Sequence, residues 1–188
     1  MTASKSTMPF DQLLDACRTF SAAPSVSQLS GLLDQADMAP DEVDARRVSD
    51  PDKPYGRCVL LETDHVEAMM ATWTARTWCA PHDHGGSIGG VRILRGKALH
   101  RIFKVTDQGL RQVKEETLEA GEILRCGSSL VHQMRALEDT LVTLHLYAGP
   151  IPFMNVYEDG TRYVVDGGCG AWVPHDQPDL LREVHAIG

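Results

Sequence analysis

Two stripes of apolar residues near the N-terminus repeat at the spacing of an amphipathic helix. The first stripe ends near residues 23–24 and consists of Phe10, Leu13, Leu14, Cys17 and Phe20. The second follows Ser25, a residue type that caps helix N-termini, and consists of Val26, Leu29, Leu32, Leu33 and Ala36. A third, short turn of helix is predicted at residues 41–44. We expect these helices to cover one mouth or flank of a larger domain.

Beyond Pro54 the pattern changes to short apolar runs separated by turn residues. Such runs predict strands at residues 58–62, 66–73, 90–94, 98–105, 112–118, 123–126 and 141–147, with tight turns at Gly96 and at residues 106–109. Many short strands with regular turns are typical of a sandwich or barrel. Residues 179–186 are predicted to form a short helix. We therefore expect one domain: a helical segment at 1–50, a β-barrel at 51–166, and a tail at 167–188 packed on the barrel.

Composition excludes several classes of partner. The chain has 188 residues, a formal net charge of −8 and a sequence pI near 5.4, so binding to nucleic acid or to an anionic membrane is not expected. Its apolar runs are far shorter than the roughly 20 residues of a membrane span, and its first residues lack the apolar core of a signal peptide. We expect a cytoplasmic protein, a monomer or small homo-oligomer. Its five scattered cysteines, with no C-x-x-C, are expected to be reduced.

The chemistry-bearing stretch is the glycine-rich segment around His82 and His84. On an extended segment these two side chains project to the same face, whereas Asp83 projects to the other and is not counted as a ligand. A further strand–turn pattern precedes His132. Three imidazoles suit iron, copper, nickel or zinc. They form a neutral variant of the two-histidine, one-carboxylate site of non-haem iron oxygenases, but also occur in catalytic zinc sites, so the ligand set alone does not choose the metal.

These spacings resemble the two half-motifs of the cupin superfamily, in which the first supplies His-x-His with a glutamate and the second one more histidine. Gly89 stands at the glutamate position, so a divalent cation held here keeps its full charge and favours an anionic substrate ligand. The resemblance implies a mainly β fold: a cupin jelly-roll barrel with the N-terminal helices packed on its outside.

At family level the chain resembles the cysteine dioxygenases, the thiol dioxygenase branch of the cupins, and specifically their bacterial members. The resemblance covers about residues 55–157 and rests on five motifs in order: Tyr55-Gly56-Arg57, Trp73, His82-Asp83-His84, His132 and Thr143-Leu144-His145-Leu146-Tyr147. It implies mononuclear iron(II), Fe(2+), held by the three histidines. It also implies oxidation of a small thiol by O2 to its sulfinate, a step of cysteine catabolism.

The same resemblance implies roles for the remaining residues. Arg57, with Tyr55, would bind the substrate carboxylate, because a guanidinium can hold a carboxylate with two hydrogen bonds. Relatives with glutamine in place of the arginine favour 3-mercaptopropionate, so Arg57 favours L-cysteine. His145 would orient Tyr147, whose hydroxyl would donate to substrate or O2. In mammalian-type relatives a cysteine at the position of Gly89 is crosslinked to the tyrosine, so Tyr147 is expected to be unmodified.

Other interpretations stay open at this point. Arg57 is alternatively a surface arginine in a salt bridge, and His145 with Tyr147 a satisfied polar pair inside the barrel. The substrate is alternatively 3-mercaptopropionate, cysteamine or a larger thiol. The protein is alternatively a zinc or nickel cupin with isomerase or hydrolase activity, or a non-enzymatic ligand-binding cupin. Cys79 is expected to pack in the core, and no role is assigned to the remaining histidines, His65, His100, His175 and His185.

Overall fold

The computed structural model describes residues 7–187. Its three α-helices are those that the sequence predicts: α1 Phe10–Arg18, α2 Val26–Gln35 and α3 Pro40–Ala45. Ser25 caps α2 as predicted: its hydroxyl accepts from the backbone N–H of Gln28, while the Gln28 side chain accepts from the backbone N–H of Ser25. None of the helices within residues 7–187 combines the length and apolar character that a membrane span requires.

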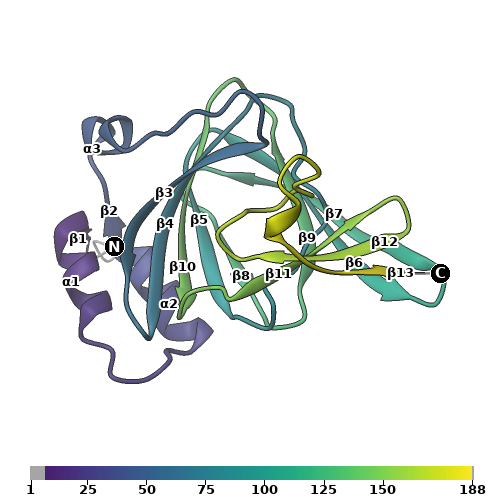
Figure 1. Ribbon diagram of the computed structural model, residues 1–188. Helices are drawn as coiled ribbons and strands as arrows, with labels where there is room; N and C mark the ends of the chain where they lie inside the picture. The colour runs from purple at the N-terminus through teal and green to yellow at the C-terminus, as the bar shows by residue number, and fades with distance from the viewer. Residues whose placement is uncertain (1–6, 188) are drawn as a thin grey trace.

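Strands make up most of the remaining chain and form two large layers (Figure 1). The first is a five-stranded sheet in the order β3-β4-β10-β5-β8, and its members are β3 Tyr55–Glu62, β4 Val66–Trp73, β5 Gly89–Arg95, β8 Ile123–Cys126 and β10 Leu141–Ala148. The second contains two three-stranded groups, β7-β6-β9 and β11-β12-β13. Its members are β6 Lys97–Thr106, β7 Gly109–Glu119, β9 Val131–Ala136, β11 Phe153–Glu158, β12 Thr161–Asp166 and β13 Leu181–Ala186. Two short strands, β1 Met8–Pro9 and β2 Ala36–Asp37, pair beside the helices.

The backbone at His82 joins the two groups of the second layer. The N–H of His82 donates to the carbonyl of His132 at 2.8 Å, and the N–H of His132 donates back at 2.9 Å. On its other side the segment bonds to β11, since the N–H of Asp83 donates to the carbonyl of Asn155 at 3.0 Å. The His-x-His segment, which lies between β4 and β5 in the chain, is therefore extended and hydrogen-bonded to β9 on one side and β11 on the other. Its pairing with β9 brings His82 beside His132.

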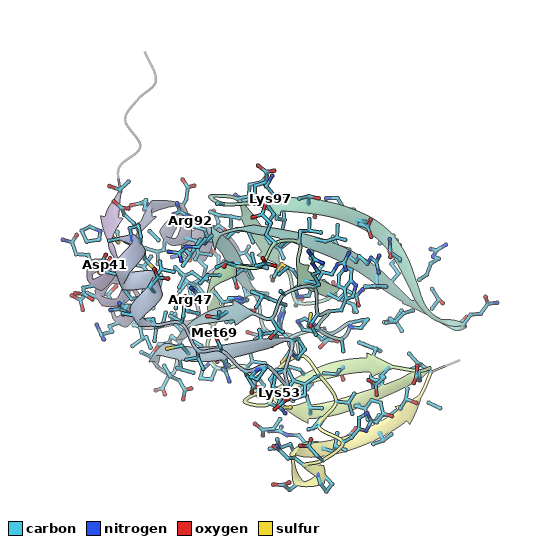
Figure 2. All side chains as sticks on the ribbon, turned by 90° about the horizontal axis from the view of Figure 1, so that it is seen from above. Asp41, Arg47, Lys53, Met69, Arg92 and Lys97 are labelled. Carbon is cyan, nitrogen blue, oxygen red and sulfur yellow. The ribbon has the colours of Figure 1, made fainter. Side chains whose placement is uncertain are left out.

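Alternation along β10 separates two cores. Leu144 and Leu146 face outward and pack with Leu13 and Leu33 of the helices. The intervening Thr143, His145 and Tyr147 are buried on the opposite face, toward the barrel interior. Helices α1 and α2 cover only the five-stranded layer, far from the C-terminal strands (Figures 1 and 2). A strand covered on both faces in this way is buried along nearly its whole length.

The tail differs from its predicted form. Residues 179–186 were predicted to be helical, but the chain makes one 3₁₀ turn at Pro178–Leu180 and then forms β13. β13 pairs antiparallel with β12, from Thr161 opposite Ala186 to Val165 opposite Leu181. The apolar spacing of this segment is compatible with either conformation, and the free edge of β12 offers backbone partners that an isolated helix lacks. The sequence patterns also missed β11 and β12.

Candidate metal centre

Three buried imidazoles converge inside the barrel. His82 comes from the extended segment between β4 and β5 that pairs with β9 and β11, His84 from the loop that follows it, and His132 from β9. One ring nitrogen of each lies within 4.8 Å of the others. The structure thus brings together the three residues that the sequence predicts as ligands, and it places them as a group that suits a metal ion.

The hydrogen bonding of these rings leaves nitrogens available to a cation. Nε2 of His132 and Nδ1 of His84 are buried and have no hydrogen-bond partner among residues 7–187. Nδ1 of His82 lies 2.9 Å from the carbonyl oxygen of Ala80, to which it donates, so Nε2 of His82 keeps its lone pair. Buried polar atoms without partners are costly, and a cation held by the three rings would satisfy them. The residues therefore fit a metal ion.

Burial keeps all three rings neutral. It lowers the pKa of His82 to about 4 and holds the pKa of His84 and of His132 well below the ordinary value, an effect that the neighbouring imidazoles reinforce. His145, on the adjacent face of β10, has its pKa lowered to about 3 by burial and by the nearby Arg57. At neutral pH the site therefore presents lone pairs, not protons, to a cation.

These shifts predict how the stability of the metal-free protein depends on pH. An unfolded histidine titrates near 6.5, whereas His82 in the folded state titrates near 4. As the pH falls below 6.5 the unfolded chain binds protons that the folded chain does not, so stability decreases, by up to about 1.4 kcal/mol per pH unit for each such histidine. Urea unfolding of metal-free protein between pH 7.5 and 5 measures this slope. A midpoint that does not change over that range would contradict the buried neutral rings.

Neighbouring candidates for coordination are engaged elsewhere. The Asp83 carboxylate accepts from the Asn155 side-chain amide at 2.9 and 3.0 Å and from the backbone N–H of Gly85 at 2.9 Å, in agreement with its predicted orientation away from the rings. The Cys79 sulfur accepts from the backbone N–H of Met134 at 3.2 Å, and burial raises the pKa of this thiol to about 12. Cys79 is thus a packed, protonated thiol, as predicted.

Gly89 has no room for a side chain. A Cβ atom there would lie 2.5 Å from the carbonyl oxygen of Leu146 and 2.5 Å from Cδ1 of Tyr147, because Gly89 is directly opposite Tyr147 in the pairing of β5 with β10. The ring of Tyr147 occupies the space that a glutamate or cysteine at position 89 would need. The three histidines consequently have no carboxylate ligand from this position.

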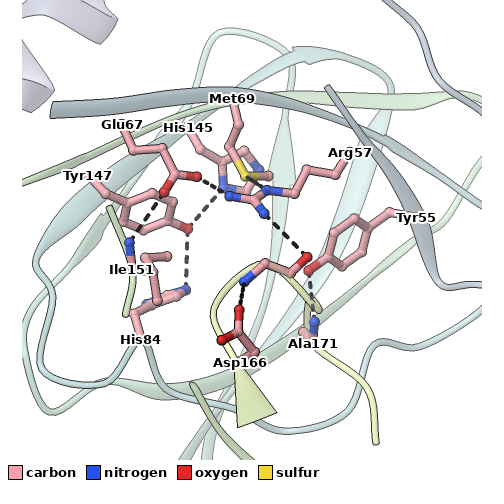
Figure 3. Close-up of polar contacts among 11 residues, drawn as sticks. Tyr55, Arg57, Glu67, Met69, His84, His145, Tyr147, Ile151, Asp166 and Ala171 are labelled. Carbon is pink, nitrogen blue, oxygen red and sulfur yellow. Dashed lines mark hydrogen bonds and ion pairs between the residues drawn. The ribbon is translucent and has the colours of Figure 1, made fainter. Parts of the chain in front are cut away.

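A chain of hydrogen bonds runs from Trp73 to the cavity along the inner face of β10. The Trp73 indole N–H donates to the Thr143 hydroxyl at 3.0 Å, and Nε2 of His145 lies 2.7 Å from the same hydroxyl. We assign the Thr143 proton to this second bond, with Nε2 of His145 as the acceptor. Neutral His145 then carries its proton on Nδ1 and donates to the Tyr147 hydroxyl at 3.1 Å. Because Nδ1 of His84 is left for a cation, Nε2 of His84 carries the ring proton and donates to the same Tyr147 oxygen at 3.2 Å (Figure 3). We therefore assign the Tyr147 hydroxyl proton to the open cavity.

Arg57 reaches the same cavity but is already paired. Its guanidinium forms an ion pair with Glu67, whose side chain is only 2% exposed, and its other nitrogens contact the sulfur of Met69 at 3.2 Å and the carbonyl of Gly168 at 3.4 Å (Figure 3). A second Glu67 oxygen accepts from the backbone N–H of Ile151 at 3.3 Å. These contacts use three of the five N–H groups of a guanidinium, so Arg57 keeps donor capacity for a ligand.

The cavity above the imidazoles is small, about 30 Å³. Its polar lining comes from the predicted site residues: Tyr55, Arg57, His82, His84, His132, His145 and Tyr147. Three methionines, Met69, Met134 and Met154, contribute to its apolar lining. The Tyr55 hydroxyl accepts from the backbone N–H of Ala171 at 2.9 Å, which fixes this ring at the cavity wall. Such a volume suits a ligand of few atoms.

Sequence reasoning missed two residues that touch the site. Glu67 was not singled out, and His100 was assigned no role, yet His100 is fully buried with Nε2 3.0 Å from Nδ1 of His132. His100 does stand in an inward alternation with Ala98 on β6, which was the available signal. Its partner became visible only with the pairing of β6 and β9.

Comparison with known proteins identifies the architecture. No family model matches the chain. An uncharacterised conserved protein with a double-stranded β-helix domain from Klebsiella pneumoniae superposes with a TM-score of 0.53 at 17% identity, over 62% of this chain and 95% of that one. The chain has the cupin fold.

Two further cupin structures superpose less closely. A cupin superfamily protein from Desulfitobacterium hafniense has a TM-score of 0.41 at 13% identity, over 50% of this chain and 77% of that one. Oxalate decarboxylase from Bacillus subtilis has a TM-score of 0.44 at 16% identity, over 55% of this chain and 26% of that one. The strand layers and the superposition on the Klebsiella protein confirm the predicted fold, a cupin barrel with helices on its outside. Function has to be argued from the site.

Proposed function

We propose that this protein is an iron(II)-dependent thiol dioxygenase that oxidises L-cysteine with O2 to cysteine sulfinate. One observation carries the proposal: the three neutral imidazoles, the Tyr147 hydroxyl and the Arg57 guanidinium all line one small cavity. With a cation held by the imidazoles, this combination would offer a cation, a proton donor and an anion-binding group to the same small molecule. The resemblance to cysteine dioxygenases assigns the same residues to those roles.

The reaction balances without a further reductant. A thiol and O2 give a sulfinic acid, R–SH + O2 → R–SO2H, in which sulfur loses the four electrons that O2 gains. A bound iron(II) ion would supply the redox chemistry that couples the two. The uncharged histidines leave the charge of that cation unneutralised, which favours a thiolate as its partner.

The remaining residues bind, orient and exclude water. Arg57 offers N–H groups to a carboxylate, and Tyr55 closes the wall beside it. His145 holds the Tyr147 hydroxyl with its proton toward the cavity, so that Tyr147 donates to the bound substrate or to O2. The methionine side chains keep the lining apolar between these groups, which strengthens each polar contact.

The pair formed by Arg57 and Glu67 bears on which thiol binds. Because the Glu67 carboxylate offsets the charge of Arg57, a substrate carboxylate gains less attraction here than from an unpaired arginine. The Glu67 carboxylate repels a zwitterion such as L-cysteine less than it repels 3-mercaptopropionate, which has a carboxylate but no ammonium group. The same ion pair favours a second candidate, a small aminothiol without a carboxylate, such as cysteamine.

Oxygen uptake by iron-loaded protein tests the proposal. We expect uptake with L-cysteine, one O2 per thiol, and cysteine sulfinate as the product by mass spectrometry. 3-Mercaptopropionate and cysteamine are measured in parallel, and protein loaded with zinc is the matched control. A higher kcat/KM for cysteamine would assign the substrate to the second candidate. If no thiol stimulates uptake by iron-loaded protein, the dioxygenase proposal is wrong, and a zinc or nickel cupin or a binding protein becomes the better interpretation.

A further inference from the structure

His132 is backed by a second histidine and a glutamate, neither of which lines the cavity. Nδ1 of His132 lies 3.0 Å from Nε2 of His100, and Nδ1 of His100 lies 3.1 Å from Oε1 of Glu116. His100 is fully buried, whereas the Glu116 side chain is 27% exposed and also accepts from the Lys114 ammonium at 2.6 Å. Two imidazoles thus connect the cavity to a carboxylate at the surface of β7.

Only one placement of protons along these hydrogen bonds leaves a lone pair of His132 free to bind a metal. Nε2 of His132 is the buried nitrogen without a hydrogen-bond partner in the described part of the chain, and it must present a lone pair to a cation. The ring proton of His132 then sits on Nδ1 and is donated to Nε2 of His100. Since His100 accepts at Nε2, its own proton sits on Nδ1 and is donated to Glu116. The opposite order would point a proton at the cation.

The other two rings have neutral partners. Nδ1 of His82 donates to the backbone carbonyl of Ala80, and Nε2 of His84 faces the Tyr147 hydroxyl. Of the three, His132 alone is connected to a carboxylate by these hydrogen bonds. A carboxylate behind an imidazole fixes its tautomer and orientation and raises its donor strength toward a metal.

We propose that His100 and Glu116 are positioning residues for the metal centre: they hold His132 in the tautomer that exposes Nε2 and make it the strongest donor of the three. The inference rests on the metal site and not on the thiol chemistry. It assigns a role to the β6–β7 hairpin, where His100 and Glu116 are direct cross-strand partners. That pairing places the carboxylate behind the ring.

Metal titration of Glu116→Gln against Glu115→Gln tests the proposal. Each substitution removes one negative charge from β7 and one ion pair, with Lys114 or with Arg101, but only Glu116 touches His100. Cobalt(II) is the probe: its dissociation constant is measured by chelator competition, and its visible absorption bands report the ligand field. We expect Glu116→Gln to weaken cobalt binding about tenfold and to shift the bands, and Glu115→Gln to leave both unchanged.

A second variant changes His100, the residue between His132 and Glu116 in this series of hydrogen bonds. His100→Phe leaves the Nδ1–H of His132 without its acceptor, and we expect a loss of cobalt affinity of about 100-fold, with circular dichroism confirming the fold. Unchanged affinity and bands in Glu116→Gln would overturn the proposal, as would equal weakening in Glu115→Gln. The titration needs neither thiol nor O2, so failure of the dioxygenase assay leaves this result interpretable, and the reverse also holds.

Discussion

Replacing His84 with alanine is expected to abolish metal binding and to lower thiol-dependent oxygen uptake about a thousandfold or more. Two imidazoles remain, and a metal that stabilises a transition state by several kcal/mol corresponds to about three orders of magnitude in rate when it is lost. Iron content by mass spectrometry after anaerobic loading, together with oxygen uptake, measures both effects. Full activity in a variant without bound metal would refute the metal centre.

Two controls separate this loss from general damage. His185→Ala changes an exposed histidine on β13 that pairs with Glu183, and it should leave iron content and rate unchanged. Tyr147→Phe removes only the hydroxyl that reaches His84 and His145. We expect this variant to keep its iron while kcat falls about 10- to 100-fold, as for the loss of one positioned proton donor. Iron loss in Tyr147→Phe would show that the hydroxyl serves the ligands and not the substrate.

Replacing Arg57 with methionine is expected to lower the free energy of unfolding by about 3 kcal/mol, the cost of leaving one partner of a buried ion pair uncompensated. The Glu67 side chain is 2% exposed, so without Arg57 its carboxylate would be a buried charge without its ion-pair partner. Urea unfolding at pH 7 measures the change. The double variant Arg57→Met with Glu67→Gln should recover part of the lost stability, because no buried charge then remains.

The double variant also separates stability from substrate binding. If Arg57 binds the carboxylate, the KM for L-cysteine in the double variant stays above that of the unmodified protein, although the double variant is more stable than Arg57→Met. The KM for cysteamine changes little. Additive losses of stability in the two single variants would contradict a coupled pair. An unchanged KM for L-cysteine would assign Arg57 to structure alone, the salt-bridge interpretation that the sequence left open.

Local patterns predicted what depends on near neighbours in the chain. The capping of α2 by Ser25 needs only Gln28, three residues away. The shared face of His145 and Tyr147 follows from strand alternation, whichever strands lie beside β10. The segment at residues 179–186 shows the limit of such patterns. Its conformation depends on pairing with the edge of β12, and a local periodicity contains no information about that partner.

By itself the sequence predicted the three histidines that converge, the barrel class and the helices on its outside, because spacing, alternation and turn residues act over short distances along the chain. Only the tertiary structure decided which side chains contact the predicted site residues from outside the cavity. Glu67 meets Arg57 across the pairing of β3 with β4, and His100 meets His132 and Glu116 through the registers of β6 with β9 and β7. Register is set by the packing of the whole sheet, so no local pattern carries it.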